Sequence, residues 1–226
     1  MALRASSSRS LGTTSVIGIL ALFCTMSEFA ILTPSIAAFS HHFVGTDITT
    51  IMLANSITGI VSVPVSVASG ALLSRVGFRR AAIGGILVMT LGGAFPFLLP
   101  DITDYGIVIV SRVVVGLGLG VMFPVGNAAI IALCEGEERS RLLGLGITIQ
   151  FVFNIIYTTV AGYLTELGWN YSFLAYLVGL VPLAAVLAWM PEAKDAVKAA
   201  PSHASADAGE GGRARSAVPP AVAGYA

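Results

Sequence analysis

Length, composition and charge exclude most soluble proteins. The chain has 226 residues, of which 56% are hydrophobic and 11% are charged, and its mean hydropathy is +0.88. A chain of this composition cannot shield its apolar side chains from water, so we expect an integral membrane protein. The formal net charge of zero gives no reason to expect a nucleic-acid partner. Two cysteines, both predicted to lie at membrane helices, do not support a disulfide framework.

Six apolar runs predict six membrane-spanning helices. They cover residues 15–39, 49–73, 81–99, 105–133, 142–165 and 171–190. Each is near or above the roughly 20 residues that a tilted helix needs to cross about 30 Å of hydrocarbon. The first run follows a basic start, as in a signal peptide, but it is too long and includes Glu28, so we interpret it as a retained span. The predicted fold is an all-α integral membrane bundle of six transmembrane helices.

The predicted domain organisation has three parts. Residues 1–14 form an N-terminal segment and residues 15–190 form the membrane domain. After Pro191 the composition becomes rich in Ala, Gly, Ser and Pro, without a periodic apolar face that would offset the entropy of ordering. Residues 191–226 are therefore predicted to be a disordered tail, or the start of a longer central loop.

The placement of charge predicts how the chain crosses the membrane. Lysine and arginine occur before the first run, between the second and third, between the fourth and fifth, and after the sixth. The alternate loops carry Asp47, Asp101, Asp104 and Glu166, with no basic residue. Since basic loops stay in the cytoplasm, both termini are expected on the cytoplasmic side, and the protein is expected in the cell (inner) membrane. His41 and His42 then lie across the membrane from His203, which excludes a shared metal site, and no metal or cofactor is expected.

The fourth run, "YGIVIVSRVVVGLGLGVMFPVG", combines an arginine with closely spaced glycines. A dinucleotide-binding loop needs Gly-x-Gly-x-x-Gly between a strand and a helix, but here Gly116, Gly118 and Gly120 lie inside a membrane run. In lipid, small residues four apart permit close approach of helix backbones, and Pro124 loosens the same helix. We therefore interpret these residues as a helix-packing motif.

The same residues resemble a motif of the major facilitator superfamily, in whose fourth helix an arginine is followed by glycines at i+4, i+6 and i+8. Arg112 and the three glycines match this spacing. "GALLSRVGFRRAAIGG" is similar to the superfamily's loop between helices two and three, with matches at Gly70, Arg75, Gly77, Arg79 and Arg80. "LGWNYSFLAYLVGLVPL" and "MPEAK" resemble segments of bacterial drug-efflux-type members. The resemblance runs from about Thr25 to Glu192 and implies the N-terminal six-helix half of a transporter that has two such halves.

Two departures from the family pattern bear on mechanism. The resemblance implies a cytoplasmic gating loop at Gly70, Ser74, Arg75, Gly77, Arg79 and Arg80, but Ser74 replaces the aspartate that takes part in closing the family's inside gate. The fifth helix also lacks the Gly-x-x-x-Gly-Pro-x-x-Gly-Gly signature of many drug/proton antiporters. Membership in the family is therefore better supported by the residues than export by an antiporter.

Glu28 and Arg112 are the ionisable residues deep within the predicted spans. A charge at that depth costs roughly 2.5 to 3.5 kcal/mol on insertion scales unless it is paired or hydrated. Counting along the two helices places both about 10 Å from the outer face, at matching depth. We hypothesise that they meet in the central cavity, where protonation of Glu28 releases Arg112 to bind a substrate. The alternative is a static ion pair that orients two helices.

Several uncharged polar residues are secondary candidates for the site. Gln150, Asn154 and Tyr157 fall at i, i+4 and i+7 on one face of the fifth span, which suits either a polar stripe facing a cavity or hydrogen bonds between helices. Asn127 lies in the fourth span. The polar residues 55, 56 and 58 near the outer end of the second span are interpreted as packing groups.

Three classes of function follow from these observations. The leading hypothesis is a proton-coupled secondary transporter of a small organic solute that acts with a second six-helix half or as a homodimer. Export by an antiporter, which the resemblance to drug-efflux members implies, is the weaker inference. The second is a membrane interaction subunit, or an inactive fragment, that transports nothing. An intramembrane enzyme is not supported, because no His-Glu, Ser-His or Asp-Asp set occurs inside the spans.

Overall fold

The structure, a computed structural model, describes residues 13–99 and 104–190, except for the side chains of Glu28 and Phe29. The tail at 191–226, predicted above to be disordered, and the first 12 residues lie outside this part of the chain. Within the described residues the secondary structure is entirely helical. The expectation of an all-α bundle is therefore confirmed.

Six helical segments are long and apolar enough to cross a membrane, as the sequence predicts. The first consists of α1 (Thr13–Thr25), η1 (Glu28–Ser35) and α2 (Ile36–His42). It is followed by α3 (Ile48–Val76), α4 (Phe78–Ala94) with η2 (Phe95–Leu98), α5 (Gly106–Leu133) and α6 (Gly136–Leu167). The last span consists of η3 (Tyr171–Gly179) and α7 (Leu180–Trp189).

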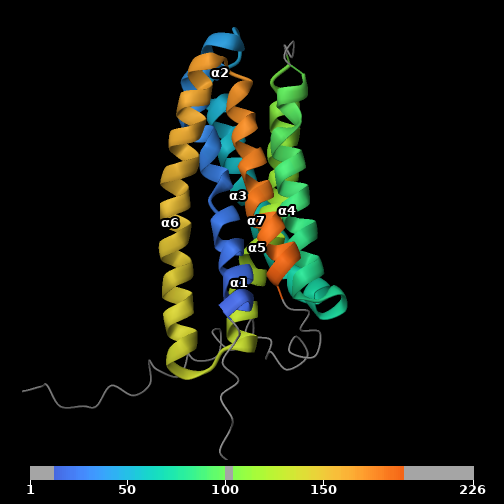
Figure 1. The fold of residues 1–226 in the computed structure, drawn as a ribbon. Coiled ribbons are helices and arrows are strands. Elements are labelled where there is room, and N and C mark those ends of the chain that lie inside the picture. Colours follow the sequence, from blue (N-terminus) through green and yellow to red (C-terminus); the bar gives the residue numbers. More distant parts are fainter. Residues whose placement is uncertain (1–12, 100–103, 191–226) are drawn as a thin grey trace, which may run out of the picture.

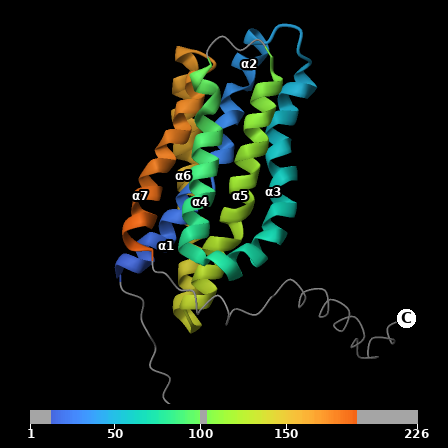
Figure 2. The same ribbon diagram turned by 90° about the vertical axis from the view of Figure 1, so that its right-hand side faces the viewer.

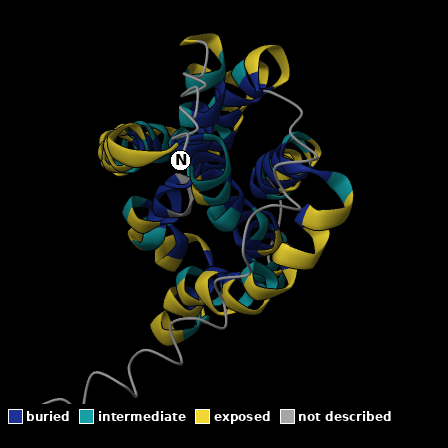
Figure 3. Ribbon diagram, turned by 90° about the horizontal axis from the view of Figure 1, so that it is seen from below, coloured by how far each residue is buried: buried dark blue, intermediate teal, exposed yellow. Residues whose placement is uncertain are grey.

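The helices run nearly parallel to one axis (Figure 1), and their contacts define two groups, one of α3, α4 and α5 and the other of α1, α6 and α7 with η3. In one group α5 lies between α3 and α4 and packs closely on both (Figure 2). In the other group α1 contacts α6 and α7. Buried residues gather in the centre of the bundle, and exposed residues lie along its outside (Figure 3). The exposed residues are largely apolar, as expected for a surface in contact with lipid.

The glycines of the predicted helix-packing motif do hold α5 against both neighbours. A Cβ at Gly116 or Gly120 would lie 2.8 Å or 2.6 Å from a main-chain oxygen of α3. A Cβ at Gly118, on the other side of α5, would lie 2.7 Å from the carbonyl oxygen of Gly85 on α4. Because these atoms belong to the backbone they cannot move aside, so a side chain at any of the three positions would separate the helices.

The first span is not the continuous helix that the sequence predicts. A turn at Met26 and Ser27 ends α1, and the next eight residues form a 3₁₀ helix that includes Pro34. Two hydrogen bonds tie this segment to α6: the Ser27 hydroxyl donates to the carbonyl oxygen of Gln150 at 2.6 Å, and the hydroxyls of Ser35 and Thr165 lie 2.8 Å apart. Apolar composition does not distinguish 3₁₀ from α geometry, so this break was not visible in hydropathy.

The two ends of the bundle differ in charge. At the end where α1 begins lie Arg75, Arg79 and Arg80 near the α3–α4 turn, and Arg139 and Arg141 in the first turns of α6; we call this the basic end. The opposite end, here the acidic end, carries Asp47, Asp104 and Glu166 and no described lysine or arginine. At the basic end Gly77, with φ of 83°, supplies the left-handed residue that allows α4 to follow α3 directly.

Candidate functional site

Arg112 is the centre of the candidate site. It lies on α5 and only 1% of its surface is exposed. Its Nη1 donates a hydrogen bond to the Tyr176 hydroxyl, and its Nη2 donates to the Ser111 hydroxyl at 3.0 Å. The guanidinium carbon lies 4.9 Å from the ring centre of Tyr176 and 5.4 Å from that of Phe173. The cation is thus held between two aromatic rings of η3, an arrangement that stabilises a desolvated guanidinium.

These contacts satisfy only part of the hydrogen-bonding capacity of Arg112. Both hydrogen-bond partners are neutral hydroxyls, and Nε is buried without a partner among the described residues. Aromatic contacts and hydroxyls reduce the cost of burying a charge but do not neutralise it. A negatively charged or strongly polar group next to Arg112 would therefore stabilise it further than the described surroundings do.

Neighbouring hydrogen bonds fix the segment of α5 that carries Arg112. The Thr58 hydroxyl on α3 donates to the main-chain oxygen of Arg112 at 3.3 Å. The Ser111 hydroxyl, besides receiving the bond from Arg112, donates to the carbonyl oxygen of Gly92 on α4 at 2.6 Å. The guanidinium is therefore presented from a rigid element held on both sides.

Glu28 is the first residue of η1, and its side chain lies outside the described part of the chain. The terminal methyl of Met26, two residues before Glu28, lies against Gly126, which is fourteen residues beyond Arg112 and so about 21 Å further along α5. The counting argument that gave the two charges equal depth did not allow for the turn, the 3₁₀ segment and α2 in the first span. The main chain at Glu28 accordingly lies nearer the basic end than that at Arg112.

Among the other predicted polar residues, Tyr157 belongs to the same buried cluster as Phe173 and Tyr176, the residues that contact Arg112. Asn127 is exposed, and its amide nitrogen donates to the carbonyl oxygen of Phe123 one turn earlier in α5. Gln150 and Asn154 are half-buried on α6, and the described contact of Gln150 is made by its main chain with Ser27. Tyr157 is fully buried against the ring of Phe153.

A pocket of about 290 Å³ lies between α3 and α5, beside the Arg112 segment; most of its surface is apolar, but we call it the polar pocket because four of its lining residues are polar. Its lining residues are Asn55, Ser56, Thr58, Gly59, Ser62, Leu119 and Phe123. Thr58 connects this pocket to Arg112 through its bond to the arginine main chain. The sequence analysis interpreted the polar residues at this end of α3 as packing groups. Thr58 and Ser62 are buried, and their hydroxyls donate to main-chain oxygens. Asn55 and Ser56 are more exposed and line the pocket.

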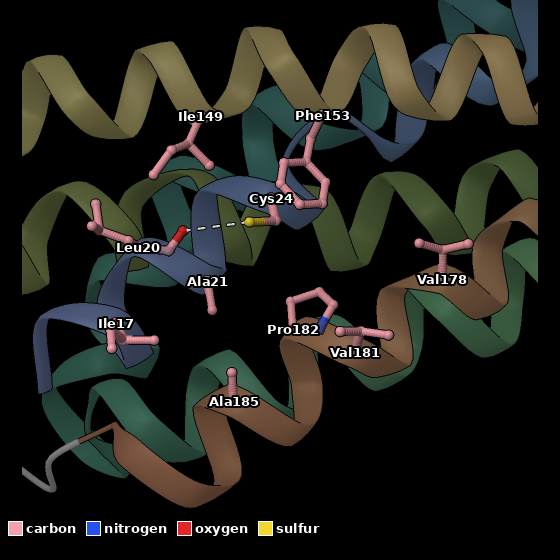
Figure 4. Close-up of a pocket in the computed structure, with 10 residues that line it drawn as sticks. All are labelled: Ile17, Leu20, Ala21, Cys24, Ile149, Phe153, Val178, Val181, Pro182 and Ala185. Atoms are coloured by element: carbon pink, nitrogen blue, oxygen red, sulfur yellow. Dashed lines mark hydrogen bonds between the residues drawn. The ribbon is translucent and has the colours of Figure 1, made fainter. Parts of the chain in front are cut away.

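A second cavity, of about 440 Å³, is almost entirely apolar (Figure 4). It is lined by Ile17, Leu20, Ala21 and Cys24 of α1, Ile149 and Phe153 of α6, and Val178, Val181, Pro182 and Ala185 of η3 and α7. The Cys24 thiol is turned back onto the carbonyl oxygen of Leu20, at 3.8 Å, so it offers little polarity to the cavity. This space suits an apolar portion of a ligand.

The residues of the predicted gating loop lie together at the basic end. Arg79 donates from Nη2 to the carbonyl oxygen of Leu187, one of the last carbonyls of α7, which lack partners within the helix. Ser74 is exposed and its hydroxyl returns to the carbonyl oxygen of Ala71. Arg75, Gly70 and Arg80 are exposed, and Gly77 forms the turn. The loop thus holds the end of the sixth span through one arginine.

Some of these contacts had no signal in the sequence. Phe173 and Tyr176 occur in the sixth span, more than 60 residues from Arg112, and nothing in their spacing indicates which helix they face. The contact of Arg79 with Leu187 is equally non-local. Among the described residues no group of three or more potential metal ligands occurs.

Comparison with known proteins agrees with this arrangement of helices and motifs. The family model described as Major Facilitator Superfamily matches residues 18–221. The chain belongs to the major facilitator superfamily. Members of the major facilitator superfamily are transporters rather than enzymes, and this chain corresponds to an N-terminal six-helix half.

Two known proteins illustrate the relationship. The "Putative multidrug resistance protein MdtD" of Yersinia enterocolitica is 29% identical over 126 residues, which cover 55% of this chain and 26% of that protein. The structure of the proton:xylose symporter XylE bound to 6-bromo-6-deoxy-D-glucose superposes with a TM-score of 0.68 at 13% identity, covering 82% of this chain and 48% of XylE. The chain therefore spans about half the length of the solved transporter and shares its fold.

Proposed function

We propose that the chain forms one half of a proton-coupled secondary transporter for a small organic solute. Its two termini would lie on the cytoplasmic side of the cell (inner) membrane, because the basic end carries the arginines that remain in the cytoplasm under the positive-inside rule. The second half would be another six-helix unit or a second copy of this chain.

The observation that carries this proposal is the burial of Arg112, whose hydrogen-bond partners in the described part of the chain are neutral hydroxyls. A guanidinium at this depth, with Nε unpartnered among the described residues, needs an anion during at least part of its working cycle. Stability alone would be served as well by apolar packing in place of the charge. The residue is thus suited to binding a polar group of the solute or a carboxylate.

Glu28 is proposed as the proton-carrying group. It begins the 3₁₀ segment η1, which packs against α6 and against η3, the element that holds Arg112. When Glu28 is ionised, its carboxylate attracts the Arg112 guanidinium, and this attraction draws η1 toward η3. Protonation of Glu28 removes the attraction and frees Arg112 to bind the solute. Because the two main chains lie at different levels, this coupling involves movement of η1 relative to α5.

The two cavities indicate the chemistry of the solute. The polar pocket beside Arg112 accepts hydrogen-bonding groups, and the apolar cavity between α1, α6 and α7 accepts a hydrophobic portion. An amphipathic organic molecule fits both. Export is the direction that the similarity to a putative multidrug resistance protein favours, whereas the fold is shared with a symporter.

The test is proton flux in sealed proteoliposomes that contain the purified protein and a trapped pH-sensitive dye. We expect external ethidium, or xylose as a second probe, to cause a proton flux that Glu28→Gln abolishes. The variant should still insert and elute as a folded protein, since Gln has nearly the same shape. A flux that is unchanged in Glu28→Gln contradicts the role of Glu28.

A non-transporting interaction subunit is the second candidate function. It is favoured by Ser74, which leaves the gating loop without the family's acidic charge. No probe-dependent proton flux, from the chain alone or together with its co-purifying membrane partners, would support this alternative and contradict transport.

A further inference from the structure

A groove of about 410 Å³ lies on the side of the bundle formed by α3, α4 and α5, apart from the two cavities described above. Its walls are apolar and include Val65, Leu72, Val76, Val88, Leu117 and Val121. Arg80 is the charged residue in its lining. The groove therefore combines an apolar channel with one cation.

Arg80 stands at one end of this groove. Arg80, Gly84 and Val88 are spaced at i and i+4 along α4 and so lie on one face of the helix, running inward from the basic end. The distance from Arg80 to Val88 is about 12 Å at 1.5 Å per residue. That depth is within one leaflet, since half of the hydrocarbon core is about 15 Å thick.

The three glycines that line the groove differ in whether helix packing requires them. Gly85 and Gly118 face each other where α4 packs on α5, and a Cβ at either would crowd the opposite helix. Gly84 is different, because no atom lies within 4 Å of the position of a Cβ there. Helix packing does not demand glycine at 84, whose absent side chain keeps the groove open.

We propose that this groove binds an anionic phospholipid, with one acyl chain between α3, α4 and α5 and the phosphate on Arg80. The occupant is inferred from the surroundings of the groove: it opens on a surface of exposed apolar side chains such as Leu72, Val88 and Leu117, and its cation lies at the membrane boundary. A guanidinium there attracts lipid phosphate, and each basic residue near an anionic surface contributes about 1 kcal/mol. The inference holds whether or not the chain transports a solute.

The test uses the purified full chain in detergent and native mass spectrometry, with dioleoyl phosphatidylglycerol and dioleoyl phosphatidylcholine as the two lipids. We expect phosphatidylglycerol to bind more tightly. Arg80→Gln should weaken phosphatidylglycerol binding about fivefold, the equivalent of about 1 kcal/mol, and weaken phosphatidylcholine binding less, because the choline cation offsets the charge of its phosphate. Gly84→Leu should weaken the binding of both lipids, because its side chain would occupy the groove, where no atom lies within 4 Å of the position of a Cβ.

Matched controls separate this site from general lipid binding. Arg141→Gln removes an exposed arginine at the same end, and Gly144→Leu adds the same side chain at another glycine with open space; neither lies in the groove. We expect both controls to bind lipid as the unmodified chain does. Val88→Phe narrows the groove from α4 and replaces Gly84→Leu if that variant does not insert.

Each outcome decides the proposal. Loss of phosphatidylglycerol binding in Arg80→Gln together with loss of both lipids in the groove-filling variant supports it. Binding that is unchanged in Arg80→Gln overturns the role of the phosphate, and binding that is unchanged in the filled groove overturns the role of the acyl chain. Equal affinity for the two lipids in the unmodified chain also overturns it.

Discussion

Tyr176 is the residue on which the burial of Arg112 depends most directly, because its hydroxyl accepts a hydrogen bond from Nη1 while its ring lies against the guanidinium. Tyr176→Phe retains the ring and leaves a buried charged donor without this partner. The expected cost is roughly 1.5 to 3 kcal/mol of unfolding free energy. The measurement is the thermal unfolding midpoint of the purified protein in detergent, followed by tryptophan fluorescence.

Tyr171→Phe is the matched control for this substitution. Tyr171 lies in the same 3₁₀ segment, is 39% exposed, and keeps its ring contact with Phe97 when the hydroxyl is removed. We expect it to leave the unfolding midpoint unchanged. Equal midpoints for the two variants would show that the hydroxyl of Tyr176 contributes nothing to holding Arg112.

Residue types could be predicted from the sequence, but their contacts could not. A single arginine in an apolar run indicates a buried cation in need of compensation, and the structure buries Arg112 fully. The groups that hold it come from η3, and the orientation of that segment is set by packing between helices distant in sequence. The predicted pairing with Glu28 remains a prediction.

At the scale of the helices, hydropathy and charge predicted six spans and a difference in charge between the ends, since both follow from composition along the chain. The glycine spacing in α5 also predicted close helix packing, because its physical cause is local. The break in the first span was not predicted. Met26, Ser27 and Pro34 carry weak signals beside a run that is apolar throughout.

The contact between α4 and α5 provides a prediction at this scale. Gly118→Ala places a methyl group against the backbone of Gly85 and Met89, which cannot move aside without separating the helices. Overpacking of this kind costs about 1 to 3 kcal/mol. We expect a lower unfolding midpoint in detergent and more cleavage by added protease at 37 °C.

Gly84→Ala tests whether the effect belongs to the contact rather than to glycine. The position is on α4, one residue from Gly85, and has open space for a methyl group. Alanine there should leave stability unchanged or raise it by up to about 1 kcal/mol, the usual gain in helix propensity. Destabilisation by both substitutions to the same extent would contradict the packing argument.

At the scale of the whole molecule, the helices differ greatly in how far the bundle covers them. In the most apolar window of each span, 69% of the residues of the first span are buried, compared with 22% for α3 and 11% for α6. The chain also covers 48% of XylE, so about half of that transporter has no counterpart here. We expect α3 and α6 to be covered by a second six-helix body in the native membrane, and α4 and α7 to face lipid.

Single cysteines test this expectation in the native membrane, in a background that lacks Cys24 and Cys134. Val63 on α3 and Ile155 on α6 are 64% and 67% exposed, and Leu91 on α4 and Val181 on α7 are 62% and 72% exposed, so the four positions are matched within this chain. Spin labels attached at these cysteines should collide with membrane-dissolved oxygen several times more often on α4 and α7, because a second body would exclude lipid and oxygen from α3 and α6. Equal oxygen accessibility at all four positions would mean that lipid covers the exposed faces of all four helices. That result would favour the non-transporting alternative, since rocking of two halves about a shared site requires these faces to be covered.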